Sequence, residues 1–328
     1  MPGQYGCLLF QYYRPIVAVR ASRRTRLRKN QAAHDSLAPL DIHNARSVGY
    51  DGTTTLGAAM TAILTTTDLT RRFGELTAVN AVSISVEAGE VFGLLGRNGA
   101  GKTTLIRMLT TLLPPSSGTA SVGGHDILHH PSAVRRLLGY VPQGLSADGE
   151  LTGYENLRVF ARLYDLPSTQ QVSRIRDSLA FMGLADAADS LVKTYSGGMI
   201  RRLEIAQSML HRPPLLFLDE PTVGLDPVAR EAVWTHIAQL RREYGTTIFL
   251  TTHYMDEAGE LCDRLAVMRR GHVVALGSLQ SLKSAAGMDT LDEVFAYYTG
   301  DAVEDAEPDH EKGYIETSNI RRTARRLG

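Results

Sequence analysis

One short segment constrains the fold of this 328-residue chain more than any other part of it. It reads Gly-Arg-Asn-Gly-Ala-Gly-Lys-Thr-Thr, with an apolar run before it at residues 91–95 and a helical pattern after it at residues 105–113. In the pattern Gly-x-x-x-x-Gly-Lys-Thr, glycines let successive backbone N–H groups surround phosphate oxygens at a helix N-terminus. The lysine reaches the β- and γ-phosphates, and the first threonine hydroxyl completes a magnesium site. We therefore predict that a phosphate-binding loop holds a nucleoside triphosphate with Mg²⁺ through Gly96, Arg97, Asn98, Gly99, Ala100, Gly101, Lys102, Thr103 and Thr104.

A second segment supplies the residues that triphosphate hydrolysis needs. The apolar run at residues 215–218 leads directly into Asp219 and Glu220. Ligands of α/β folds bind at the C-terminal ends of the strands, so we expect both carboxylates beside the phosphate-binding loop. We expect Asp219 to hold Mg²⁺ through water, and Glu220 to accept a proton from the attacking water. An ordinary strand with an acidic turn would explain this segment if the loop were absent.

Short apolar runs alternate with helical patterns in the middle of the chain, which predicts an α/β domain with parallel strands. We expect strands at residues 62–66, 82–86, 91–95, 139–142, 215–218, 247–251 and 265–268. Residues 152–188 instead carry two helical patterns with no strand between them. An all-helical insert therefore interrupts the α/β core.

Further motifs follow one another in the order found in ATP-binding cassette (ABC) proteins. The segment Tyr195-Ser196-Gly197-Gly198-Met199 resembles the signature motif of that family, although Leu and Gln are commoner at its two ends. Gln143 resembles the Q-loop glutamine, Asp226 in Gly-Leu-Asp-Pro the D-loop aspartate, and His253 the switch histidine. Taken alone, such a histidine is more often a surface residue and Ser-Gly-Gly a turn. Their order and spacing favour the resemblance.

This resemblance covers about residues 61–300 and implies a fold. That fold is a P-loop NTPase cassette of α/β class, with a RecA-like core and an antiparallel β subdomain. An α-helical subdomain is inserted at about residues 144–196.

The resemblance also implies roles for individual residues. Two cassettes would pair head to tail, so that Ser196, Gly197 and Gly198 contact the γ-phosphate held by the partner's Lys102. Gln143 would serve both hydrolysis and Mg²⁺ binding, and His253 would hold the γ-phosphate and the attacking water. Asp226 would communicate across the dimer, and Phe73, where the family more often has tyrosine, would stack on adenine.

The end of the predicted domain resembles the cassettes of drug and lipid exporters of the daunorubicin-resistance type. The resemblance lies in residues 269–277, in Leu-Asp-Glu-Val-Phe at residues 291–295 and in Tyr-Thr-Gly at 298–300, while Ala296 and Tyr297 differ from the expected Leu and His. It implies an ATP-hydrolysing subunit at the cytoplasmic face of the membrane. Its partners would be an integral membrane permease subunit and a second cassette, most simply a second copy of the chain, with no nucleic acid.

Two other functions and one other interpretation stay open. Some cassettes act on ribosomes or DNA, but those usually have two cassettes in one chain or a long coiled-coil insertion. A non-hydrolysing scaffold is disfavoured because Lys102, Glu220 and His253 are all present. Residues 143–155 are expected to line the permease groove, or else to form a loop that covers the helical insert.

Composition sets the outer limits of these predictions. With 35 basic and 35 acidic side chains and 43% apolar residues, the composition is typical of a globular protein. The balanced charge does not indicate a surface that binds polyanions. Its two cysteines, Cys7 and Cys262, are too few for a disulfide framework or a zinc site. No run approaches the roughly 20 apolar residues of a membrane-spanning helix.

Both ends of the chain differ from its middle. Residues 1–60 form a basic extension with three possible interpretations: translation begins near Met60, or the segment is a disordered arm, or it is a targeting segment. Residues 301–328 form a charged tail. The histidines at positions 125, 129 and 130, with Asp126, are interpreted as a surface loop in preference to a metal site.

Overall fold

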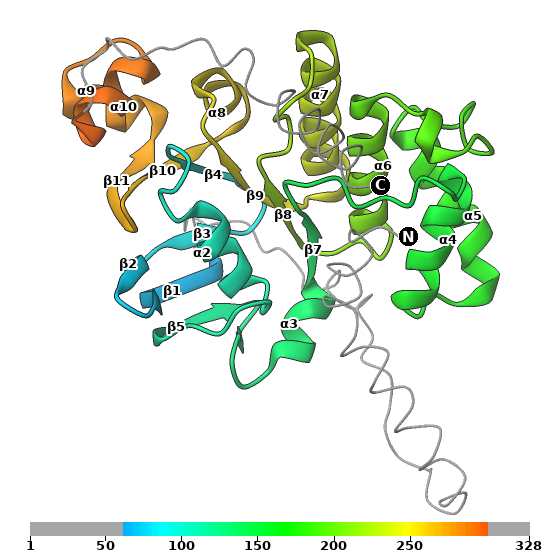
Figure 1. Ribbon diagram of the computed structural model, residues 1–328, viewed down its shortest axis with the longest axis horizontal. Helices are drawn as coiled ribbons and strands as arrows, with labels where there is room; N and C mark the ends of the chain where they lie inside the picture. Colours follow the sequence, from blue (N-terminus) through cyan, green and yellow to red (C-terminus); the bar gives the residue numbers. More distant parts are fainter. Residues whose placement is uncertain (1–61, 301–328) are drawn as a thin grey trace, which may run out of the picture.

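Two β-sheets and the helices around them make up the computed structural model, which describes residues 62–300 (Figure 1). The predicted extension, the start near Met60 and the charged tail lie outside the described residues.

Six strands form the sheet that carries the candidate site, in the order β11-β10-β4-β9-β8-β7. All neighbours run parallel except at one edge, where β11 pairs antiparallel with β10. The strands are β4 (Val91–Leu95), β7 (Leu138–Val141), β8 (Leu215–Asp219), β9 (Thr247–Thr252), β10 (Arg264–Arg269) and β11 (His272–Ser278). The predicted α/β class with parallel strands is confirmed.

The three central strands are mostly apolar because both faces of the sheet are covered. Every residue of β4, β8 and β9 is buried, as expected of a parallel sheet between two layers. Phe92, Phe249 and Phe217 occupy neighbouring positions on β4, β9 and β8, with ring centroids 5.3 Å apart in each adjacent pair. This aromatic row holds together the strands whose ends carry the site.

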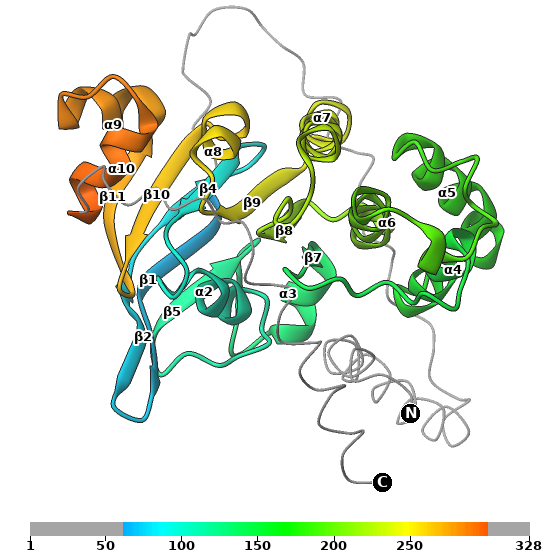
Figure 2. The same ribbon diagram turned by 45° about the horizontal axis from the view of Figure 1, so that its top comes forward.

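Helices cover both faces of the parallel sheet. They are α2 (Lys102–Leu109), α3 (Pro131–Leu137), α6 (Gly197–Met209), α7 (Pro227–Tyr244) and α8 (Met255–Leu261). In both views α7 and α8 lie on one face, and α2 lies on the other with the second sheet (Figures 1 and 2). Among residues 62–300, no helix combines the length and the apolar character needed to cross a bilayer.

The second sheet is antiparallel, in the order β2-β1-β5-β6 with β3 paired to β1. Its strands are β1 (Ala62–Phe73), β2 (Leu76–Val82), β3 (Ser85–Glu87), β5 (Ser117–Val122) and β6 (His125–Asp126). The single strand expected at residues 82–86 is wrong, because the chain is split between β2 and β3. There the Thr66 hydroxyl donates to the Val82 carbonyl and accepts from the Ile84 N–H, which interrupts the ladder.

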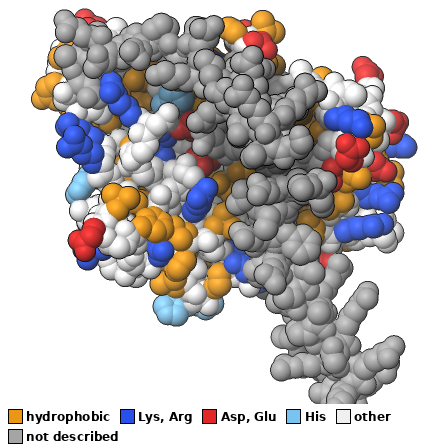
Figure 3. Space-filling view, in the orientation of Figure 1, with side chains coloured by type: hydrophobic (Ala, Val, Ile, Leu, Met, Phe, Trp, Pro, Cys, Tyr) orange, Lys and Arg blue, Asp and Glu red, His pale blue; other side chains and the backbone are white. Residues whose placement is uncertain are grey.

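The helical insert and the last two helices lie at opposite ends of the molecule (Figure 1). The insert contains α4 (Gly153–Leu163), α5 (Ser168–Phe181) and the short helix η1 (Val192–Thr194). Acidic, basic and hydrophobic side chains all lie on the face of the insert that Figure 3 shows. At the other end are α9 (Leu279–Ala286) and α10 (Leu291–Thr299). Val294 and Phe295 are buried against β10 and β11, whereas Tyr297 is exposed, so this departure from the exporter pattern lies outside the core.

Residue His211, just after α6, connects this helix to the insert. Its ring stacks on Tyr164, which follows α4, at a centroid distance of 3.7 Å. Burial lowers the pKa of His211 from 6.5 to about 4. The neutral imidazole is therefore the form that the fold accommodates.

We predict that the fold loses stability in acid through His211. Its pKa is depressed in the folded state, so its contribution is complete above pH 6.5 and is lost as the pH falls towards 4, by up to about 3 kcal/mol. Urea unfolding measured across this pH range should show a shallower decline for His211→Phe, which keeps a stacking ring. The exposed His125→Phe should decline like the wild type. Equal declines for wild type and His211→Phe would contradict this assignment.

Candidate functional site

The loop between β4 and α2 lies against the antiparallel sheet. Gly99 and Gly101 have φ values of +80° and +109°, in the region that favours glycine. A Cβ on Gly101 would collide with the Ala78 carbonyl oxygen on β2. The helix starts at Lys102, directly after the loop. These features match a loop that presents backbone N–H groups at a helix N-terminus.

Lys102 connects this loop to β8. Its side chain is only 4% exposed, and its ammonium donates to the Gly96 carbonyl oxygen at 2.6 Å. The same ammonium lies 3.0 Å from Glu220 Oε1, so the predicted phosphate ligand and the predicted base form an ion pair. The two motifs predicted from separate parts of the chain are thus brought together.

Asp219, the last residue of β8, is held through one oxygen only. Its Oδ1 accepts from Thr251 Oγ1 at 2.7 Å and from Thr103 Oγ1 at 3.2 Å. Its Oδ2 is buried without a hydrogen-bond partner. Burial raises the pKa of Asp219, and the hydrogen bonds from Thr251 and Thr103 oppose that shift. A carboxylate oxygen left free beside a threonine hydroxyl fits the oxygen ligands that Mg²⁺ prefers.

Glu220 stands at the centre of the predicted hydrolytic residues. Its Oε2 lies 3.2 Å from His253 Nδ1 and accepts from Gln143 Nε2 at 3.3 Å. Burial raises the pKa of Glu220, but His253 and the charge of Lys102 together outweigh it and lower the pKa. Glu220 is consequently a carboxylate at neutral pH.

The backbone of Glu220 is unusual for a residue with a side chain. Its φ is +48°, in the left-handed region. Its N–H donates to the carbonyl and hydroxyl oxygens of Thr251 at 3.1 and 3.0 Å. Neighbouring strand β9 therefore fixes the turn that aims this side chain.

Thr251 is a site residue that the sequence analysis left without a role. It is fully buried on β9, donates to Asp219 and accepts from the Glu220 N–H. Its signal in the sequence is a threonine near the end of a strand, two residues before His253.

The signature segment and Asp226 lie together, apart from the loop. Ser196 Oγ caps α6 by accepting from the Met199 N–H, and Asp226 caps α7 by accepting from the Ala229 N–H. A Cβ on Gly198 would come within 2.8 Å of the Ala229 side chain, so the two helix starts pack closely. In both views β8 separates α6 from α2 (Figures 1 and 2). Among residues 62–300, the hydrogen bonds and ion pair of Lys102 are to Gly96, Arg97 and Glu220 and not to the signature residues.

Tyr195 has a packing role where the family usually has leucine. The residue is buried, and its hydroxyl donates to the Ala187 carbonyl oxygen at 2.5 Å. Its ring also fills the space beside Gly153, where a Cβ would collide with the hydroxyl. Tyr195 therefore ties the start of the signature helix to the helical insert.

Phe73 lies at the end of β1, where the chain turns into β2. Its ring is 45% exposed, and the Arg71 guanidinium lies 4.6 Å from its centroid. An exposed aromatic face is thus available on the sheet that also contacts the phosphate-binding loop.

The histidine-rich turn forms local contacts of its own. His129 Nδ1 lies 2.9 Å from Asp126 Oδ1, and the rings of His125 and His130 meet edge to face. Within the described part of the chain, no group of three or more His, Cys, Asp or Glu side chains is arranged to hold a metal ion.

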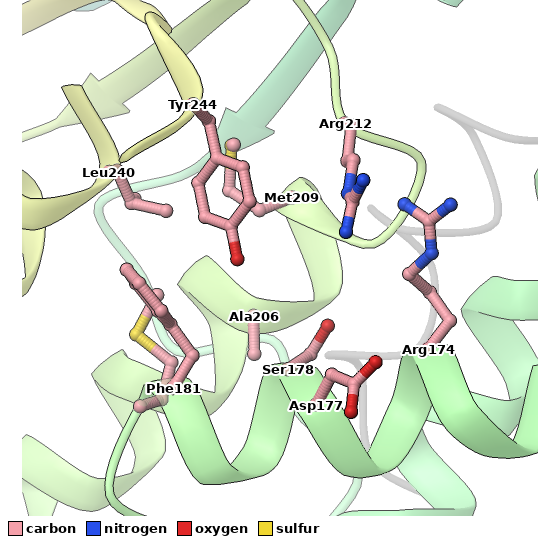
Figure 4. A pocket seen from close by; sticks show the side chains of 10 residues that line it. Arg174, Asp177, Ser178, Phe181, Ala206, Met209, Arg212, Leu240 and Tyr244 are labelled. Atoms are coloured by element: carbon pink, nitrogen blue, oxygen red, sulfur yellow. The ribbon is translucent and has the colours of Figure 1, made fainter. Parts of the chain in front are cut away.

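A separate pocket lies between α5, α6 and α7 (Figure 4). Arg174 and Arg212 lie at one side of it and Phe181 and Leu240 at the other. The Arg212 guanidinium lies 5.4 Å from the centroid of the Tyr244 ring, and Asp177 shares the lining. None of the lining residues is one of the predicted nucleotide ligands.

Comparison with known proteins points to one family. Residues 79–223 match the family model described as ABC transporter. The chain is 47% identical over 231 residues to the daunorubicin/doxorubicin resistance ATP-binding protein DrrA of Streptomyces peucetius, which covers 70% of each chain. It is 43% identical over 226 residues to the Nod factor export ATP-binding protein I of Ralstonia nicotianae, covering 69% of this chain and 70% of that protein. A solved ATP-binding subunit of an ABC transporter aligns with a TM-score of 0.65 at 30% identity, covering 72% of this chain and 99% of the other.

We predict that Thr251→Val weakens both the fold and the site. Valine keeps the shape but leaves Asp219 Oδ1 and the Glu220 N–H each without one buried partner, which should cost about 1–3 kcal/mol of unfolding free energy. Urea unfolding measures that loss, and steady-state ATP hydrolysis should fall in parallel. Thr235→Val, on the exposed face of α7, makes the same chemical change and should alter neither. Wild-type stability of Thr251→Val would contradict the role given to this hydroxyl.

Proposed function

The chain belongs to the ABC transporter family as an ATP-binding, ATP-hydrolysing subunit, and from this premise we propose that it drives export through a separate membrane permease. The observation that carries this proposal is the single cluster in which Glu220 meets Lys102, Gln143 and His253. It combines a phosphate ligand, a base and two groups able to orient water and phosphate.

In this proposal the phosphate-binding loop, residues Gly96 to Thr104, binds the phosphates of ATP. Backbone N–H groups of the loop and the Lys102 ammonium neutralise the β- and γ-phosphates. Thr103, Asp219 and Gln143 would hold Mg²⁺, which would supply positive charge to the phosphate oxygens when bound. The free Oδ2 of Asp219 supports this assignment.

Glu220 then accepts the proton of the attacking water. Its lowered pKa keeps the carboxylate ionised at neutral pH, as a base requires. His253 and Gln143, both beside Glu220 Oε2, orient the water and the γ-phosphate. Because Lys102 pairs with Glu220 at 3.0 Å, the γ-phosphate competes with this carboxylate for the ammonium.

A second copy of the chain completes the site. Because Ser196, Gly197 and Gly198 make no hydrogen bond to Lys102 within the described part of the chain, we infer a head-to-tail dimer in which they contact the partner's nucleotide. The hydroxyl and N–H groups at the start of α6 are suited to a γ-phosphate. Asp226, packed beside them, communicates across the dimer, and Phe73 stacks on the adenine of its own site.

The transported cargo is proposed to be a drug-like or lipid-like molecule. One relative is named for daunorubicin/doxorubicin resistance and another for Nod factor export. These names favour membrane export over action on ribosomes or DNA. The cassette would work at the cytoplasmic face of the membrane, attached through its permease.

We predict that Glu220→Gln retains ATP binding, loses turnover and accumulates as an ATP-bound dimer. The amide cannot take up the proton, and the loss of its charge removes the competitor for Lys102. Phosphate release, nucleotide binding and size-exclusion chromatography measure the three effects. Lys102→Ala should lose nucleotide binding itself. Normal hydrolysis by Glu220→Gln would overturn the assignment of the base.

We also predict that Glu220→Gln co-purifies with a multi-spanning membrane protein. The protein is captured from native membranes in mild detergent with ATP, because a trapped dimer should stay on its permease. Mass spectrometry should find the permease at near-equal abundance, and Lys102→Ala serves as the matched control. Ribosomal proteins or nucleic acid without a membrane subunit would favour the soluble alternative.

A further inference from the structure

A buried ion pair lies on α6, one turn beyond the signature residues. Arg201 and Glu204 are three residues apart, and their side chains are each only 2% exposed. Arg201 Nη1 lies 3.0 Å from Glu204 Oε2. Neither residue belongs to the motifs that suggested the site.

Both members of the pair bind the backbone of the segment that contains Gln143. Arg201 donates to the Pro142 and Gln143 carbonyl oxygens, both at 2.7 Å. Glu204 Oε1 accepts from the Ser146 N–H, from the Ser146 hydroxyl at 3.0 Å and from the Ala147 N–H at 3.3 Å. Residues 142–147 are therefore fixed to α6 at both ends.

The chemistry of the pair explains why the attachment is rigid. A guanidinium presents a planar fork that can donate to two successive carbonyls at once, which a lysine ammonium does with less definition. Charge-assisted hydrogen bonds of this kind are the stronger ones in proteins. Burying two charges costs about as much as their attraction returns, so the pair adds little net stability. Its main consequence is geometric.

We propose that Arg201 and Glu204 are positioning residues for ATP hydrolysis, which join the start of α6 to residues 142–147 so that the two move as one body. The side chain of Gln143 extends from this fixed backbone, and its Nε2 donates to Glu220 Oε2 at 3.3 Å. The ion pair thus sets where Gln143 stands relative to the base. This inference rests on the roles proposed above for Gln143, Glu220 and the signature residues.

The arrangement connects the two nucleotide sites of a head-to-tail dimer. Ser196 to Gly198, at the start of α6, contact the nucleotide of one site, whereas Gln143 and Glu220 of the same chain work in the other. A displacement of α6 by the first nucleotide is passed through Arg201 and Glu204 to Gln143. The occupancy of one site therefore adjusts the hydrolytic residues of the second.

The test replaces the pair by apolar residues of similar size, Arg201→Met with Glu204→Leu. Such a replacement keeps the core filled, so thermal unfolding should stay close to that of the wild type. We expect kcat to fall at least tenfold, KM for ATP to change less than about threefold, and the Hill coefficient for ATP to fall towards 1. Arg201→Lys should recover part of the lost kcat.

The matched control is Arg202→Met, on the same helix. Arg202 donates to the Met182 carbonyl oxygen at 2.9 Å and makes no hydrogen bond to residues 142–147 among those the structure describes. It should leave the Hill coefficient unchanged. If the double variant fails to fold, Arg201→Lys is tested in its place in the same assay. A wild-type kcat and Hill coefficient for Arg201→Lys would then overturn the proposal.

Glu220→Gln, assayed in parallel, separates this inference from the function on which it rests. Loss of turnover in Glu220→Gln with wild-type kinetics in the double variant would overturn the positioning role alone. Retained turnover in Glu220→Gln would overturn the assignment of the base and, with it, the basis of the inference.

Discussion

The parallel alignment of β4, β9 and β8 is the constraint on which the rest of the site depends. The three strands run in the same direction. The loop after β4, the carboxylates at the end of β8 and His253 after β9 therefore all lie at the C-terminal ends of the strands. There the Lys102–Glu220 ion pair joins two residues that are 118 positions apart in the sequence. Phenylalanine packing in the middle of the same strands keeps their ends in register.

Much of this arrangement could be predicted from the sequence. A strand that is buried on both faces is mostly apolar, and so β4, β8 and β9 were found with nearly correct bounds. The loop, the carboxylates and His253 could be predicted because each directly follows such a strand. The antiparallel sheet was harder to predict: β5 alternates small polar residues with Ala120 and Val122, its only two buried residues, so it has no apolar run to detect. The break between β2 and β3 depends on a hydroxyl of β1, which no local pattern reveals.

Local sequence patterns do not reveal contacts between residues that are distant in the chain. Thr251 looks like an ordinary strand residue until Asp219 and Glu220 are beside it. Arg201 and Glu204 look like the polar face of an amphipathic helix, yet they are buried because residues 142–147 cross over them. Sequence reasoning predicts that such side chains are exposed, since charged residues rarely lie inside without a partner. The fold supplies that partner in the form of backbone groups.

The left-handed backbone of Glu220 implies a local cost, which the proposed role of its carboxylate as the base would explain. Glycine or asparagine would suit this φ better, since a bulkier L-residue loses of order 1 kcal/mol there. Glycine has no carboxylate, and asparagine is one methylene shorter and carries no charge. If Glu220 is the base as proposed, selection for thermostability alone would favour substitutions at this position that abolish ATP hydrolysis. A more stable variant recovered from such a selection should be sequenced here before it is accepted as active.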